Sequence, residues 1–226
     1  MSTEQIAVGS RPATKKSSAG RGRPPDSSKR DAIVAAAAES FFAHGFAASS
    51  IEQIAAEAGV SKVTVYNHFG DKGALFAAAV ECECEKMRGH FLIDAQLAEL
   101  GIRDRLTAIG EAIVAFLSRP EMVQFERRIA AETEREPDIG AAFLKAGPWR
   151  MKLAFSAFLA FADERGELSI PDPMLAAEQF VSMCKGMGDL ERRFGAIPSA
   201  ADDARRIAGA VEVLLKAYAP RGTAPA

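Results

Sequence analysis

The stretch SIEQIAAEAGVSKVTVYNHFGDK, residues 50–72, most constrains what this chain can fold into. It opens with Ser50 and Gln53 at capping-box spacing, so the Ser50 hydroxyl can accept a bond from the first turn while Gln53 reaches back to the Ser50 amide. Apolar residues then recur at helical spacing as far as Gly59, which favours the open conformation that ends a helix. A serine two residues later can cap a second helix over residues 62–68. Two short helices joined in this way predict a helix–turn–helix, whose second helix fits the major groove of DNA.

The remaining sequence predicts an all-α protein. Apolar residues make up 48% of the chain, which is ample for a buried core, and they follow a helical periodicity. Asp71 can cap the helix that follows the motif. Besides the two helices of the motif, we expect helices over residues 27–44, 72–88, 101–118, 120–136, 149–165, 174–194 and 199–218, and a short one between Pro137 and Gly147.

Positive charge is concentrated at the beginning of the chain. Residues 1–30 hold seven lysines and arginines against Glu4 and Asp26, although the whole chain has a net charge of −2. Residues 1–26 lack apolar periodicity, so we expect a disordered basic tail. Its segment GRGRPP resembles the core of an AT-hook, in which Arg21 and Arg23 would enter the minor groove. The alternative is a solvated tail, or a segment appended for expression, with no DNA contact.

Several classes of protein are disfavoured by the sequence. No apolar segment reaches the roughly 18 residues that span a membrane, so we expect no membrane insertion and a cytoplasmic protein. Cys82 and Cys84 point to opposite sides of their helix and cannot share a metal ion. Because the sequence has no phosphate loop, nucleophile motif or cluster of metal ligands, we expect no cofactor, no metal and no enzymatic activity.

The motif resembles the DNA-binding signature of the TetR/AcrR family of bacterial regulators. The matching residues are Val60, Ser61, Lys62, Thr64, Tyr66, Phe69, Lys72 and Leu75. The chain departs from the common pattern at Val63, where the family often has glycine, and at Asn67 and His68, where aromatic residues are common. These departures leave the fold prediction unchanged. The resemblance implies a three-helix DNA-binding head joined to a helical body that binds a ligand and dimerises.

Residues 125–195 resemble, more loosely, the C-terminal domain of the AefR-like branch of this family. The matching residues are Arg128, Glu132, Pro137, Ala146, Gly147, Pro148, Arg165, Gly166, Glu167, Leu168, Asp172, Pro173, Ala176, Ala177, Glu178, Gln179, Phe180, Lys185 and Gly186. With this match, we divide the chain into the basic tail (1–26), a helix–turn–helix domain (27–76) and a ligand-binding and dimerisation domain (77–220). The small core of the head should be stabilised by packing against the helices that follow it.

The resemblance also implies which residues contact DNA. Base edges are assigned to Lys62, Thr64 and Asn67, because Thr can contact a thymine methyl group and Asn can pair with adenine. The phosphate contacts are assigned to Ser50, Tyr66, His68 and Lys72, and Val63 lies on the same helix. Each of these residues could instead be a capping or solvated helix residue.

In the body, the resemblance implies both a dimer interface and a pocket. The last two long helices, around residues 155–161 and 180–187, would pair with their twins in the homodimer. A pocket for a small apolar or aromatic molecule would lie between the helices that begin near Met122 and Trp149 and the link helix. Its suggested lining is Phe116, Phe125, Arg128, Trp149 and Met183. The alternative is that these apolar residues form only the core and the interface.

Together these features predict a homodimeric repressor that binds a palindromic operator in double-stranded DNA and is released by a small apolar effector. Repression rather than activation rests on the family resemblance alone. Two alternatives remain open. One is an architectural, weakly specific DNA-binding protein that uses the basic tail, and the other is a carrier of apolar ligands.

Overall fold

The computed structural model describes residues 26–89 and 100–220. Within these ranges the chain is helical and contains no strand, which confirms the predicted all-α fold. The helices are α1 (Asp26–His44), α2 (Ile51–Glu57), α3 (Lys62–Phe69), α4 (Lys72–Gly89), α6 (Ile102–Leu117), α7 (Pro120–Thr133), α8 (Pro137–Ala146), α9 (Pro148–Glu164), α10 (Pro173–Arg193) and α11 (Ala200–Ala217). Residues 1–25 of the predicted disordered tail, including Arg21 and Arg23, lie outside the described residues, and its last residue, Asp26, begins α1.

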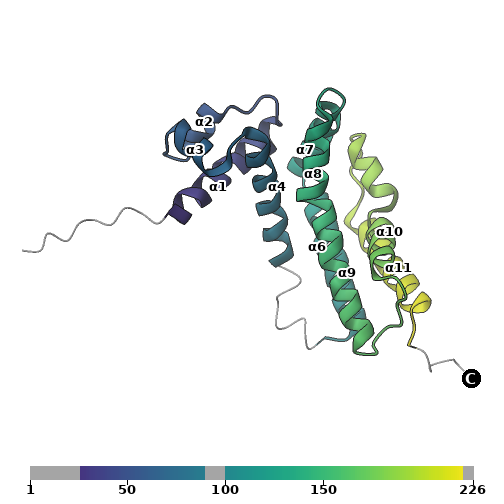
Figure 1. Ribbon diagram of the computed structural model, residues 1–226. Coiled ribbons are helices and arrows are strands. Elements are labelled where there is room, and N and C mark those ends of the chain that lie inside the picture. Colours follow the sequence, from purple (N-terminus) through teal and green to yellow (C-terminus); the bar gives the residue numbers. More distant parts are fainter. Residues whose placement is uncertain (1–25, 90–99, 221–226) are drawn as a thin grey trace, which may run out of the picture.

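The helices are arranged as a head at one end of an elongated body (Figure 1). Helices α1, α2 and α3 form the head, and α4 leads from it along the body, where it packs against α8. Helices α6, α7, α8 and α9 form the middle of the molecule, and α10 and α11 pack together on the side away from α4. Since α4 is one continuous helix, it crosses the boundary predicted at residue 76, and the domain limits stay a prediction.

The caps that begin the short helices are local and mostly follow the sequence. The Ser50 hydroxyl accepts a bond from the Gln53 amide at 3.1 Å, and the Ser61 hydroxyl accepts one from Thr64 at the same distance. Asp71 caps α4. One part of the capping-box prediction is wrong, because the Gln53 side chain turns forward and donates to Glu57 at 3.0 Å instead of reaching back.

Helix α7 is shorter than predicted. We expected it to continue to Glu136, but it ends at Thr133. The reason is Pro137, which begins α8 and restricts the residue before it to non-helical backbone angles; Glu136 has φ −129° and ψ 81°.

The core is divided into two clusters of buried side chains. The cluster around the head contains Phe41 and Phe76, whose ring centroids lie 5.3 Å apart, and it also contains Phe125 and Ile129 of α7. The body has its own cluster, centred on α6, α9, α10 and α11. The head core is therefore completed by side chains from the body, as the small size of the three-helix unit led us to expect.

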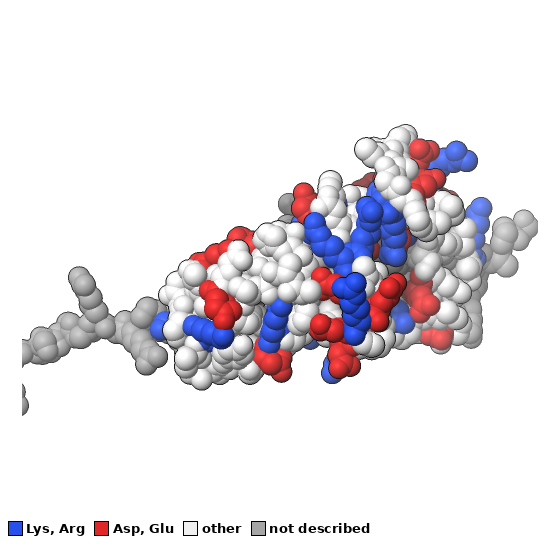
Figure 2. Space-filling model, turned by 90° about the horizontal axis from the view of Figure 1, so that it is seen from above, with Lys and Arg blue, Asp and Glu red and all other residues white. Residues whose placement is uncertain are grey.

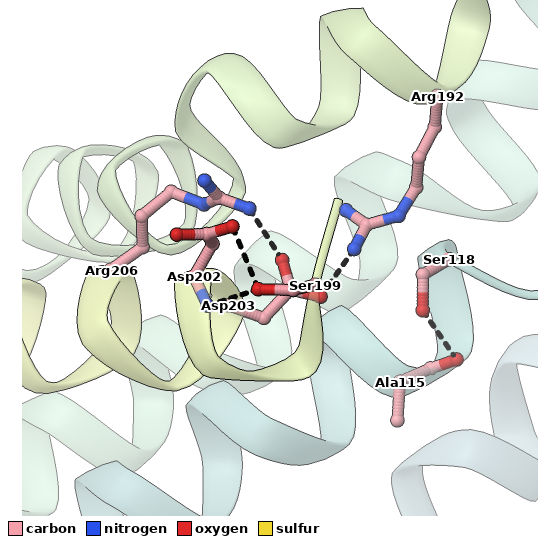
Figure 3. A network of polar contacts seen from close by, with 7 residues as sticks. All are labelled: Ala115, Ser118, Arg192, Ser199, Asp202, Asp203 and Arg206. Atoms are coloured by element: carbon pink, nitrogen blue, oxygen red, sulfur yellow. Dashed lines mark hydrogen bonds and ion pairs between the residues drawn. The ribbon is translucent and has the colours of Figure 1, made fainter. Parts of the chain in front are cut away.

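Helix α10 has a kink that the sequence did not predict. Gly186 has φ 46° and ψ −147°, which only glycine adopts readily. Arg206 of α11 packs against this turn: a Cβ added at Gly188 would lie 2.3 Å from Arg206 Nη2. Figure 3 shows how Asp203 holds this arginine at 2.6 Å and also pairs with Arg192 near the end of α10. The bend is thus fixed by contacts between α10 and α11.

No helix among residues 26–89 and 100–220 combines the length and apolar character needed to span a membrane.

Candidate nucleic-acid interface and internal cavity

Helix α3 presents one face to solvent and one to the head core. Val65 is buried, whereas Val63 is 66% exposed and Tyr66 is 41% exposed. Lys62 and Asn67 are also exposed, and Thr64 and His68 are half-buried. Large apolar side chains that point into water from a short helix are characteristic of a contact surface. The exposed face of α3 can therefore be inserted into a groove without disturbing the core.

Two of the predicted base-reading side chains already have partners within the head. Lys62 forms an ion pair with Glu52 of α2, and its Nζ lies 5.8 Å from the centre of the Tyr66 ring. The Glu52 carboxylate raises the pKa of Lys62 through a hydrogen bond and its charge. The Thr64 hydroxyl lies 2.9 Å from the Ser61 hydroxyl. Both side chains would exchange these contacts for new ones on a DNA surface.

The predicted phosphate-contacting residues lie around α3 but differ in accessibility. Ser50 is exposed and caps α2. Lys72 is half-buried, with its Nζ 4.5 Å from the centre of the Phe46 ring and 3.4 Å from the Ala47 carbonyl oxygen. Burial lowers the pKa of Lys72. The charge of Lys72 thus lies where the head joins α4.

Seen from above, the surface carries basic and acidic side chains side by side (Figure 2). On that face the charges are interspersed instead of forming one broad positive area. Non-specific DNA binding needs many unopposed basic groups facing the phosphates. The described residues on this face therefore favour recognition by a localised motif.

A cavity of about 390 Å³ lies inside the body, between α4, α6, α7, α9 and α10. Its walls are mostly aromatic and aliphatic, with Phe116, Phe143, Trp149, Phe155, Met87, Met122 and Met151 among the lining residues. Phe42 of the head also lines it. Charged groups are confined to Glu126, Lys152, Glu178 and Lys185. This combination of apolar walls and a few polar groups is typical of small-molecule sites.

The charged groups of the cavity have partners of opposite charge. Lys152 pairs with Glu178 at 3.0 Å, and Glu126 pairs with Arg193, also at 3.0 Å. Lys185 lies 3.3 Å from Asp189. Burial raises the pKa of Glu126 despite the nearby Arg193 and Lys185. The cavity is therefore close to electrically balanced.

The five residues suggested for the pocket lining are distributed over different places. Phe116 and Trp149 line the cavity. Phe125 lies in the head core, where its ring stacks on Phe42 at 4.1 Å between centroids. Arg128 reaches the end of α1, and Met183 packs against the body core. The sequence missed Phe42, since a residue of α1 gives no local sign that it reaches into the body.

The segments suggested for the dimer interface are partly internal. Phe155 and Phe180 are buried, with ring centroids 5.3 Å apart, so these two side chains hold the body together and are not available to a second chain. Phe161 and Met187 of the same two segments are exposed, and the pairing of these helices stays a prediction. Exposed apolar residues lie on α9, which has Trp149, Leu153 and Phe161, and on α10 and the segment after it, which have Met174, Leu175, Met187, Leu190, Phe194 and Ile197. The sequence pattern did not distinguish the inner from the outer face of these helices.

Comparison with known proteins agrees with the geometry. Residues 33–79 match the bacterial regulatory proteins of the tetR family, and residues 104–220 match the C-terminal domain of AefR-like transcriptional repressors. The chain belongs to the TetR family. TetR-family regulators bind DNA. Membership in this family confirms the prediction that the protein is a DNA-binding transcriptional regulator and not an enzyme.

Two solved structures match this chain over most of its length and over nearly all of theirs. A TetR-family transcriptional regulator from Mesorhizobium loti is 28% identical with a TM-score of 0.72, and the match covers 87% of this chain and 99% of that one. The flavonoid-responsive regulator FrrA is 32% identical with a TM-score of 0.68, covering 86% of this chain and 98% of FrrA.

A curated relative matches over a shorter stretch. The HTH-type transcriptional repressor SCO4008 of Streptomyces coelicolor is 44% identical over 59 residues, which is 26% of this chain and 30% of that repressor.

Proposed function

We propose that this TetR-family protein is a cytoplasmic, homodimeric repressor that binds a palindromic operator and leaves it when a small aromatic molecule fills the cavity. The observation that carries the DNA-binding part is the exposed face of α3, with Val65 buried beneath it. The cavity with its aromatic walls supports the part concerning the effector.

On DNA, we assign base reading to Lys62, Thr64 and Asn67, with Val63 against a thymine methyl group. Ser50, Tyr66, His68 and Lys72 are assigned to the phosphates, which position the protein without carrying sequence information. A two-fold dimer places two copies of α3 about one helical turn of DNA apart, or a multiple of it. This geometry requires an inverted repeat.

Selection from a randomised duplex pool at moderate salt tests the DNA-binding part. Enrichment of an inverted repeat with one fixed half-site spacing supports the proposal. If only A·T-rich DNA is enriched, without a repeat, and removal of residues 1–26 abolishes binding, the architectural alternative replaces it. That alternative rests on the basic residues of the tail, including Arg21 and Arg23.

For dimerisation, we propose the outer apolar surface of α10 and the segment after it, in which Phe194 is 85% and Ile197 is 94% exposed. Side chains of this size are rarely left in water on a monomer. Leu190→Glu, which places a charge in the same surface, should produce monomers in analytical ultracentrifugation. Leu144→Glu on α8 is the matched control. A monomeric wild-type protein at micromolar concentration would count against this assignment.

For the effector, we propose a neutral aromatic molecule with hydroxyl or carbonyl groups along one side. The paired charges on the cavity wall leave no partner for an added ion, and burying an unpaired charge is costly. The similarity to the flavonoid-responsive regulator FrrA is consistent with this class.

A matched series of biphenyls tests the effector class. It consists of 4-phenylphenol, biphenyl, biphenyl-4-carboxylate and 4-phenylbenzylammonium, titrated by calorimetry. Trp149 is the chain's single tryptophan and lines the cavity, so its fluorescence reports where the probe binds. We expect 4-phenylphenol to bind most tightly and to change this fluorescence. Tighter binding of either charged analogue would contradict the proposal.

A further inference from the structure

Helix α7 contacts both the cavity and the DNA-binding head. Met122 and Glu126, in its first half, line the cavity. Arg128 and Glu132, in its second half, contact the backbone of the head. From Met122 to Glu132 is about 15 Å along a helix, at a rise of about 1.5 Å per residue. A single rigid element therefore spans the two sites.

Arg128 holds the end of α1. Its Nη1 donates to the carbonyl oxygens of Phe42 at 3.1 Å and Ala43 at 2.6 Å. The last carbonyls of a helix have no intrahelical partner, and they carry the negative end of the helix dipole. The guanidinium thus satisfies groups that α1 cannot satisfy by itself. Because Phe42 also lines the cavity, this contact lies beside the space that an effector would fill.

Glu132 holds the connection between α1 and α2. Its Oε2 accepts hydrogen bonds from the backbone amides of Phe46 at 3.0 Å and Ala47 at 3.1 Å. The neighbouring Gly45 has φ 87°, and a Cβ placed there would lie 2.5 Å from the other carboxylate oxygen. The backbone therefore approaches this carboxylate closely, and only glycine fits. The connection leads directly to Ser50 and the start of the helix–turn–helix.

We infer that Arg128 and Glu132, together the α7 clamp, transmit occupancy of the cavity to the DNA-binding head. A molecule that displaces Phe42 or the first half of α7 changes the four bonds of the clamp, and with them the position of α2 and α3. The two clamp residues are positioning residues: neither lines the cavity, and both contact the backbone of the head. The inference rests on the proposed function for its consequence at the operator, but the movement itself is independent of DNA.

Cavity-filling substitutions replace the unidentified effector in the test. Val181 lines the cavity from α10, so Val181→Trp fills part of it; Ser182→Trp, from a more exposed part of the same wall, is the second filling variant. Leu153→Trp on α9 adds the same side chain outside the cavity and is the control. Circular dichroism and thermal unfolding establish that each variant is folded.

Amide hydrogen exchange of the full-length protein gives the first readout. Exchange in the peptide covering residues 42–49 reports the opening of bonds at Phe46 and Ala47. We expect Val181→Trp to raise exchange in this peptide about tenfold, within the usual range of coupling between sites. When Val181→Trp is combined with Glu132→Ala, exchange in this peptide should rise by less than about twofold. Glu132→Gln, which keeps an acceptor oxygen, should restore part of the response.

Two results would overturn the inference. One is unchanged exchange of the peptide covering residues 42–49 in both filling variants. The other is an equal rise in exchange with and without the Glu132 side chain. Operator affinity, measured on the selected inverted repeat, is the second readout, and filling should weaken it only when the clamp is intact. If no inverted repeat is selected, the proposed function fails while the exchange data still decide whether the clamp couples the two sites.

Discussion

Lys62 of α3 and Glu52 of α2 form an ion pair on the surface of the helix–turn–helix, so the lysine that we propose as a base-reading residue is paired with a carboxylate in the free protein. The carboxylate raises the pKa of Lys62, and the lysine in turn lowers the pKa of Glu52. Both side chains are largely exposed, with relative side-chain exposures of 49% and 63%. In the proposed complex, DNA competes with Glu52 for this lysine.

Replacing this acid should strengthen operator binding. Glu52→Gln frees Lys62 and removes a negative charge near the phosphates, so we expect a gain of about two- to fivefold in affinity at low salt. The gain should shrink as salt is added, because exposed charges are screened. Fluorescence anisotropy over a salt series measures it. Glu57→Gln removes the same charge from α2 without touching Lys62, and an equal gain there would contradict the competition.

Thr64 and Tyr66 should have different effects on specificity. Thr64→Ala removes a methyl and hydroxyl assigned to a base edge, so discrimination at one operator position should fall by about 1–3 kcal/mol. Tyr66→Phe should weaken binding to all sequences alike, because a phosphate contact carries no sequence information. Sequencing of a bound randomised pool distinguishes the two effects. An unchanged sequence preference for Thr64→Ala would remove it from the base-reading set.

Gly110 of α6 packs tightly against side chains of α10 and α11. A Cβ at this position would lie 2.8 Å from Cγ2 of Ile207 and 3.3 Å from the Cys184 sulfur. Overpacking a core costs about 1–3 kcal/mol, which exceeds the gain of about 1 kcal/mol in helix propensity. Urea unfolding of Gly110→Ala should therefore show a net loss of stability of up to about 2 kcal/mol. Adding Ile207→Ala should make the two losses less than additive, and full additivity would contradict this explanation.

Glu126 should make the protein less stable as pH rises. Burial raises its pKa in the folded state above the ordinary 4.5, so its favourable contribution is present below pH 4.5 and is lost as pH rises through the raised value. In Glu126→Gln this loss is absent. The stability of the variant relative to wild type should therefore increase from acid to neutral pH. Arg193 also lies 3.3 Å from Asp189, so it still has an ionic partner when Glu126 is replaced. Urea unfolding across this range measures the difference, and a constant difference would contradict the raised pKa.

The features that the sequence predicted correctly depend on near neighbours. Ser61 and Asp71 cap helices through residues three positions away, so the signal is contained in one turn of chain. The end of α7 also has a local cause in Pro137.

The features that the sequence did not predict depend on contacts between distant segments. The bend at Gly186 packs against Arg206 from the next helix. Arg128 was a candidate for the pocket lining, yet it reaches Phe42, which is 86 positions away. Apolar periodicity shows that Phe155 or Phe125 is buried, but it does not show against which helix.

The shared core of the head limits how this protein can be recombined. Because Phe125 and Ile129 of α7 belong to the same cluster as Phe41 and Phe76, a chimaera that grafts only α1–α4 onto another body would lose part of its interior. Helices α7 and α8 have to be transferred with the head, together with the clamp and part of the cavity wall. New DNA specificity is therefore more readily reached by changing the exposed side chains of α3 than by exchanging whole domains.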